Sequence, residues 1–123
     1  MIQGVITEYL DALIPLRIRG KQAGEFLVHA VVDTGFNDYL TLPPEIISSL
    51  NLSFFDTVSV VLGNGVVVNT DLFLAYVVWQ EEVREITVQS AAGDALVGMR
   101  LLLDNQVTLQ VRPHGSVVIE AIP

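Results

Sequence analysis

The feature of this sequence that most constrains its fold is the distribution of β-branched aliphatic residues. The 123 residues include 19 Val and 9 Ile against 16 Leu, and they fall in short runs separated by Gly, Asn, Asp or Pro. β-Branched side chains favour strands, and this punctuation is typical of strands joined by turns. We therefore expect an all-β fold in which most strands pair antiparallel through tight turns.

Ten segments have the pattern expected of strands, and four short segments have that of hairpin loops. The expected strands are residues 4–9, 12–18, 25–32, 39–42, 58–62, 66–71, 72–79, 85–89, 107–112 and 117–122. Glycine, asparagine and proline mark the loops, because these residues adopt the backbone angles that turns require. The expected loops are residues 19–24, 63–65, 80–84 and 113–115.

Helical signals are confined to two places. Residues 43–50 begin with two prolines, continue with apolar residues at helical spacing and end before Asn51, which predicts about two turns of helix. Residues 99–103 are mostly apolar and follow Gly98, so a second short helix is expected there. We found no linker and no tandem repeat.

Length and composition exclude several classes of protein. A chain of 123 residues suits one domain, 1–123, and 51% apolar residues exclude intrinsic disorder. A net charge of -8 disfavours binding to nucleic acids and to anionic membranes. The absence of cysteine excludes disulfides and thiolate chemistry. With no basic segment at the N-terminus and no apolar run long enough to span a bilayer, we expect a cytoplasmic protein.

The strongest chemical signal follows the strand expected at residues 25–32. Asp33-Thr34-Gly35 places a carboxylate directly after an apolar run and before a glycine turn. A carboxylate in that position needs surrounding donors, so it indicates either hydrogen bonding by nearby backbone amides or a functional role. As a bare tripeptide the motif also occurs in ordinary turns. A weak internal echo accompanies it, because residues 30–35 and 95–98 are both small and aliphatic and both end on glycine.

The order of the motifs resembles that of the retropepsin-like aspartic proteases. Val-Val-Asp-Thr-Gly at residues 31–35 is followed by residues 36–43, a hairpin with a glycine-rich tip, and Leu96-Val97-Gly98 before a short helix. The resemblance runs from Leu13 to Ile119 and is closest to the small single-domain aspartyl proteases of prokaryotes. It implies a closed β-barrel of the acid protease fold with one or two short helices, and it implies hydrolysis of peptide bonds.

The resemblance also implies roles for individual residues. Asp33 matches the catalytic aspartate, Thr34 the residue whose hydroxyl braces two active-site loops, and Gly35 the glycine that lets the loop approach the carboxylates. Phe36 departs from the small residue common at this position, so the pocket beside the aspartate should be narrower. The residues expected to contact substrate are Phe36, Gly63, Asn64 and Gly65 at the tip of a flap, and Val97 and Gly98 in the psi-shaped loop.

Hydrolysis by carboxylates needs a second acid. Two close carboxylates can share one proton, so that one accepts a proton from water while the other donates one. The sequence has one Asp-Thr-Gly, and the second echo has Val97 where an acid would be needed. A second copy related by a twofold axis would supply the missing Asp33. We therefore expect a homodimer that cleaves peptides or proteins, with the Asp33 loops and the terminal segment 117–119 in its interface.

Two other interpretations of the whole chain stay open. A retropepsin-like module without proteolytic activity could serve in binding or dimerisation, and an acidic adaptor unrelated to this family would leave the order of the motifs to coincidence. His29 and His114 are far apart, and we expect no metal and no cofactor. Asp38 could either perturb Asp33 or cap its loop.

Overall fold

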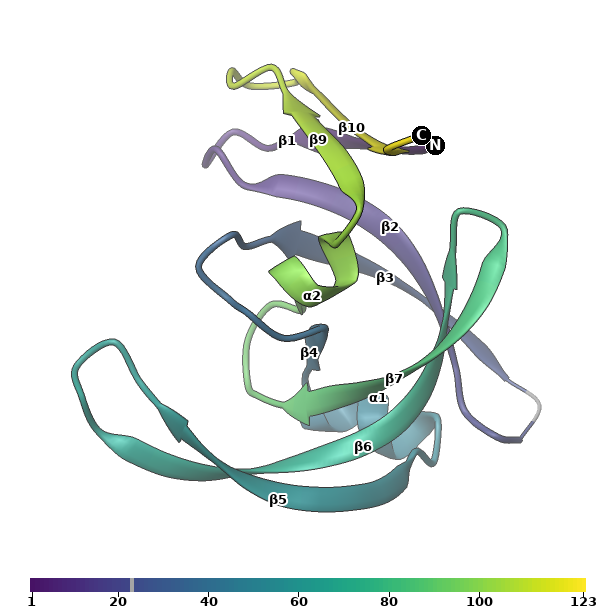
Figure 1. The fold of residues 1–123 in the computed structure, drawn as a ribbon, viewed down its shortest axis with the longest axis vertical. Helices are drawn as coiled ribbons and strands as arrows, with labels where there is room; N and C mark the ends of the chain where they lie inside the picture. The colour runs from purple at the N-terminus through teal and green to yellow at the C-terminus, as the bar shows by residue number, and fades with distance from the viewer. Residues whose placement is uncertain (23) are drawn as a thin grey trace.

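The structure, a computed structural model, describes residues 1–22 and 24–123. Within these residues a 10-stranded sheet and two short helices make up the regular elements (Figure 1). The loop expected at 19–24 includes Ala23, which lies outside the described residues. The strands are β1 (Ile2–Ile6), β2 (Ala12–Arg19), β3 (Glu25–Val32), β4 (Leu40–Leu42), β5 (Ser53–Val61), β6 (Val67–Trp79), β7 (Glu82–Ser90), β8 (Leu96–Val97), β9 (Asn105–Leu109) and β10 (Ser116–Ala121). The helices are α1 (Pro44–Ser49) and α2 (Met99–Leu102).

Part of the sheet closes on itself. The strands follow one another in the order β6-β7-β4-β8-β3-β2, and β2 then pairs with β6 through Ile18 and Val77. Most neighbours are antiparallel, whereas β3 with β8 and β4 with β7 are parallel. The all-β class and the ring of strands expected from the sequence are therefore confirmed.

The core fills the interior of this ring. Along β2 the buried side chains alternate with more exposed ones, so that Ile14, Leu16 and Ile18 point inward and are at most 1% exposed. Ala30 and Val77 approach from neighbouring strands with no exposed surface. The alternation of period two along these strands is thus the pattern by which they bury their apolar faces.

The terminal strands form an extension of the sheet beyond β2. β1 pairs with β2 and β10, and β10 pairs with β9, whose other edge is free of any described strand. Val117–Ile119, the segment expected in a dimer interface, is paired on both sides within the chain, so its backbone has no free edge. The unpaired backbone at this end of the sheet belongs to β9.

Several strand boundaries differ from the predicted ones for local reasons. β5 begins at Ser53 rather than residue 58, and Phe54 packs edge-on against Phe73 with 6.0 Å between ring centroids. β6 is continuous where two strands were predicted, because Asp71 is exposed and accepts a hydrogen bond from the Thr57 hydroxyl of β5 at 3.0 Å. The two-residue strand β8 was too short to be predicted.

The end of one strand and one predicted turn also differ from prediction. β1 ends at Ile6, before residue 9, because the Thr7 hydroxyl accepts hydrogen bonds from the backbone N–H groups of Tyr9 and Asp11. The turn after β6 occupies only Gln80 and Glu81, both with positive φ (48° and 74°), rather than five residues. Both predicted helices are present; α1 is one residue shorter than expected at each end, and α2 is one residue shorter at its C-terminal end. No helix among the described residues is long and apolar enough to cross a membrane.

Closure of the ring by β2 and β6 predicts a large loss of stability on truncation at Ile18. Ile18→Ala should lower the free energy of unfolding by about 2–5 kcal/mol, because the removed atoms leave a cavity in a fully buried position. Leu27→Ala on the adjacent strand is the control, since Leu27 is 55% exposed. Chemical denaturation measures both, and equal small losses would contradict this account of the core.

Candidate active site

Asp33 lies where β3 ends, on a loop fixed by backbone hydrogen bonds. The Asp33 N–H donates to the carbonyl of Val97 at 2.9 Å, and the Phe36 N–H donates to the Asp33 carbonyl at 3.2 Å. The Gly35 N–H donates to the Asp33 carboxylate oxygen Oδ1 at 2.9 Å. One edge of the carboxylate is thus held by the motif's own glycine, and the side chain is half-buried.

The two parts of the internal echo lie side by side. β3 and β8 pair in parallel, with Val31 opposite Leu96 and Val32 opposite Val97. The buried Thr41 of β4 supports β8 from its other side, where its hydroxyl accepts a hydrogen bond from the Leu96 N–H at 2.9 Å. The strand that precedes Asp33 is therefore hydrogen-bonded directly to the Leu96-Val97-Gly98 element.

Gly98 is required by close backbone packing. A Cβ atom at this position would collide with the carbonyl oxygen of Asp38 and would lie 2.6 Å from a ring carbon of Phe36. The Gly98 N–H donates to the carbonyl of Tyr39 at 3.0 Å. The chain after β8 therefore passes directly against the loop between Asp33 and β4.

Asp38 braces this loop. Its Oδ1 accepts a hydrogen bond from the Tyr39 N–H at 2.8 Å and lies 3.7 Å from Nε of Arg100, while its Oδ2 accepts one from Gln89 at 3.3 Å. The Arg100 guanidinium also lies over the Tyr39 ring, 5.6 Å from its centroid. Of the two roles considered for Asp38, these contacts support capping of the loop.

Thr34 and Gly35 are exposed at the outer side of the loop. The Thr34 hydroxyl has no hydrogen-bond partner among the described residues. The face of the loop that carries the motif is consequently open in a single chain.

The hairpin of β5 and β6 projects toward the same side of the molecule as the loop after β3 (Figure 1). Its tip is closed by the Leu62 N–H, which donates to the Val66 carbonyl at 2.8 Å, and by Asn64 Oδ1, which accepts from the Val66 N–H at 3.0 Å. Gly65 has φ of +84°, whereas Gly63 does not have a left-handed backbone. Only Gly65 therefore needs the conformational freedom of glycine.

A cavity of about 300 Å³ lies between this hairpin and the loop after Asp33. The loop and the flap hairpin were expected near the site, whereas Gln89 and Arg100 were not predicted, because their proximity depends on long-range pairing. The one hint in the sequence was that Arg100, one of six basic residues, closely follows Gly98. Among the described residues the lining does not include Asp33, Thr34 or the hairpin tip. The lining residues are Gly35, Phe36, Asn37, Asp38, Val60, Val61, Gln89 and Arg100.

Potential metal ligands do not gather near this loop. Within residues 1–22 and 24–123, no three His, Asp or Glu side chains lie close enough together to hold a metal ion. His29 is exposed on β3 opposite Pro15, and His114 lies in the turn before β10 with φ of 67°.

Comparison with known proteins gives a structural relative. No protein-family model matches the sequence, and no curated protein matches it. A crystal structure of a retropepsin-like aspartic protease from Rickettsia conorii is similar, with a TM-score of 0.52 and 16% sequence identity over 97% of this chain and 91% of that one. The chain therefore has a fold similar to that of the retropepsin-like aspartic proteases.

The close packing at Gly98 predicts that a methyl group at this position displaces the loop between Asp33 and β4. Gly98→Ala should lower the free energy of unfolding by about 1–3 kcal/mol, because the loop at Asp38 has to move aside. Gly63→Ala is the matched control, since its Cβ would meet no atom within 4 Å. Thermal or chemical unfolding compares the two, and an equally stable Gly98→Ala protein would contradict the described packing.

Proposed function

We propose that this protein is an aspartic endopeptidase that acts as a homodimer, with the two Asp33 carboxylates activating the attacking water. The observation that carries the proposal is the placement of Asp33-Thr34-Gly35 at the hydrogen-bonded junction of β3 and β8. This placement occurs within a fold similar to that of a known retropepsin-like aspartic protease. A catalytic aspartate needs a loop fixed by hydrogen bonds and a carboxylate that is still partly accessible, and Asp33 has both.

The second acid of the pair is proposed to come from another copy of the chain. Asp38 is the nearest acidic residue in sequence, but its two oxygens are occupied by Tyr39, Gln89 and Arg100. The exposed Thr34 and Gly35 leave room for a second loop to approach. Two facing carboxylates cannot both ionise cheaply, so one would keep the proton that acid catalysis needs and the other would act as base.

The β5–β6 hairpin is proposed to close over bound peptide. Val60 and Val61 line the cavity beside Gly35 and Phe36, so the hairpin already forms one wall of the space next to the motif. Its tip carries largely exposed aliphatic side chains, with Val61 at 68% and Val67 at 61%. A hinged hairpin of this kind can admit an extended peptide and then exclude bulk water.

Substitution of the aspartate tests the proposed chemistry. Asp33→Asn should lower the rate of peptide cleavage by about 10²–10⁴-fold, because the amide keeps the shape but can neither accept nor supply the shared proton. The fold should persist, since the amide oxygen can still accept the Gly35 N–H. A peptide-library digestion, with folding checked by circular dichroism, measures both.

Asp56→Asn is the matched control for that experiment. Asp56 is also followed by a residue whose backbone N–H donates to its Oδ1, here Thr57 at 2.8 Å, but it lies on the exposed face of β5. The Asp56→Asn protein should cleave peptides at the wild-type rate. A folded Asp33→Asn protein that cleaves at the wild-type rate would refute the endopeptidase proposal and favour a non-catalytic binding module.

The proposed role of the hairpin predicts different effects for its two glycines. Gly65→Ala should reduce kcat/KM by about tenfold, because an alanine at φ of +84° is strained and alters the tip. Gly63→Ala should leave kcat/KM nearly unchanged. Steady-state kinetics on both folded variants compares their kcat/KM values. An unchanged kcat/KM for Gly65→Ala would show that the hairpin is an ordinary surface element.

A further inference from the structure

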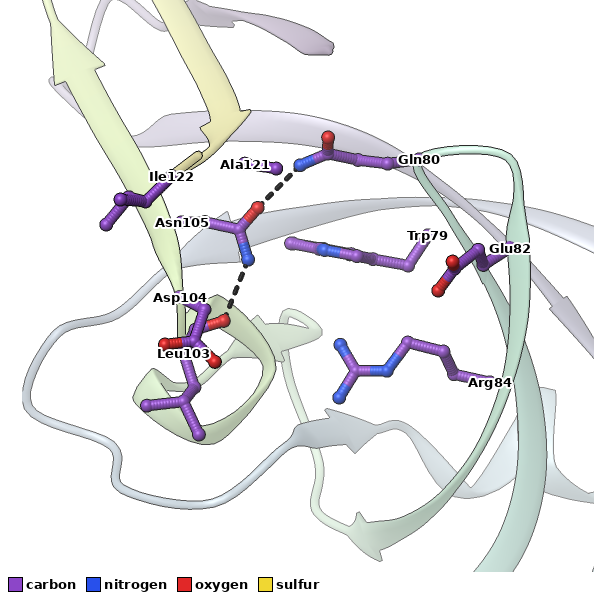
Figure 2. Close-up of a pocket in the computed structure, with 9 residues that line it drawn as sticks. All are labelled: Trp79, Gln80, Glu82, Arg84, Leu103, Asp104, Asn105, Ala121 and Ile122. Carbon is purple, nitrogen blue, oxygen red and sulfur yellow. Dashed lines mark hydrogen bonds between the residues drawn. The ribbon is translucent and has the colours of Figure 1, made fainter.

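A second cavity lies between the β6–β7 turn, the start of β9 and the end of β10 (Figure 2). Its volume is about 390 Å³, which is within the range of small-molecule sites and far larger than one water molecule. It shares no lining residue with the cavity beside Asp33. Any ligand bound here would therefore be independent of the proposed catalytic loop.

The wall of this cavity contains a buried donor without an acceptor. Trp79 is the only tryptophan in the chain and is 4% exposed. Its indole Nε1 is buried and has no hydrogen-bond partner among the described residues. Buried N–H groups are almost always bonded, so an orphan beside a cavity points to a partner that enters the cavity.

Three charged side chains line the same cavity without pairing. Arg84 projects into it from β7 in Figure 2, and within the described part of the chain its guanidinium forms no ion pair or hydrogen bond. Glu82 and Asp104 also line the cavity, and neither carboxylate makes an ion pair among the residues described. One cation and two anions around one space favour a ligand that itself carries both signs of charge, because a simple anion would be repelled by the two carboxylates.

The remaining lining combines apolar surface with a fixed amide pair. Leu103 and Ile122 contribute exposed aliphatic side chains, at 67% and 56%. Gln80 donates to Asn105 Oδ1 at 2.6 Å, and Asn105 donates to the Leu103 carbonyl at 2.9 Å (Figure 2). The indole lies between this amide pair and Arg84 in the view of Figure 2.

We propose that this cavity binds a zwitterion of amino-acid or dipeptide size with an aliphatic side chain. The ligand's carboxylate pairs with Arg84 and accepts the indole hydrogen bond. Its ammonium group faces Asp104 on the opposite wall, and its side chain packs on Leu103 and Ile122, which lie on the same wall as Asp104 (Figure 2). Since Nε1 has no free surface, the wall of the cavity has to move slightly for the indole hydrogen bond to form. The emission of the sole tryptophan should respond to that change.

Fluorescence titration with the dipeptide glycyl-leucine tests the proposal. A saturable change in Trp79 emission is expected below about 10 mM ligand. Arg84→Met should weaken binding by about tenfold or more, since it removes the charge that pairs with the carboxylate. Arg112→Met is the matched control, because Arg112 is exposed in the loop before β10, and it should bind like the wild type. Asp33→Asn should also bind like the wild type, which separates this site from the proposed catalytic one.

Blocked forms of the dipeptide test the proposed ligand class. N-acetyl-glycyl-leucine lacks the ammonium charge and glycyl-leucinamide lacks the carboxylate, and each should bind at least about tenfold more weakly. Equal binding of either blocked form would overturn the assignment to a zwitterion. No saturable change, undiminished binding by Arg84→Met, or emission that depends on protein concentration and not on dipeptide would overturn the site itself.

Discussion

The parallel pairing of β3 with β8 is the interaction on which the candidate active site depends. It fixes the backbone of Asp33 through the Val97 carbonyl and brings Gly98 directly against the loop that continues to β4. The two strands are separated by more than sixty residues along the chain, so their pairing is a long-range contact, and β4 joins the other edge of β8 to β7 in the same ring. The motif's geometry is therefore a property of the closed ring and not of the tripeptide alone.

Much of the fold could be predicted from the sequence because most strands are recognisable as local runs of apolar and β-branched residues. The alternation in β2 and the β-branched run of β3 bury one face each, and the paired prolines start α1 where helix entry was expected. β8 was not predicted because a strand of two residues is too short to be recognised as a run. β6 was predicted as two strands because an aspartate is typical of a strand end. In the structure Asp71 is exposed within the strand, and its carboxylate accepts a hydrogen bond from the Thr57 hydroxyl on β5.

The same distinction separates the predicted parts of the site from the missed ones. Asp33, its glycine and the Gly98 element are visible as contiguous motifs, whereas Gln89 and Arg100 reach Asp38 only through long-range strand pairing. The cavity beside Trp79 was not predicted for the same reason, since its walls come from three separate segments, residues 79–84, 103–105 and 121–122. Local patterns thus identify residues that carry chemistry, and tertiary pairing decides what surrounds them.

The central claim is that catalysis needs one Asp33 from each of two chains, and mixing subunits tests it most directly. Wild-type chains at constant concentration are equilibrated with increasing amounts of Asp33→Asn chains, and peptide cleavage is measured. If the two carboxylates are shared, activity falls in proportion to the wild-type fraction, to about one-tenth at a ninefold excess, because most wild-type chains then pair with a variant chain. Activity that stays constant while the chains exchange would show that one chain suffices, and it would contradict the account.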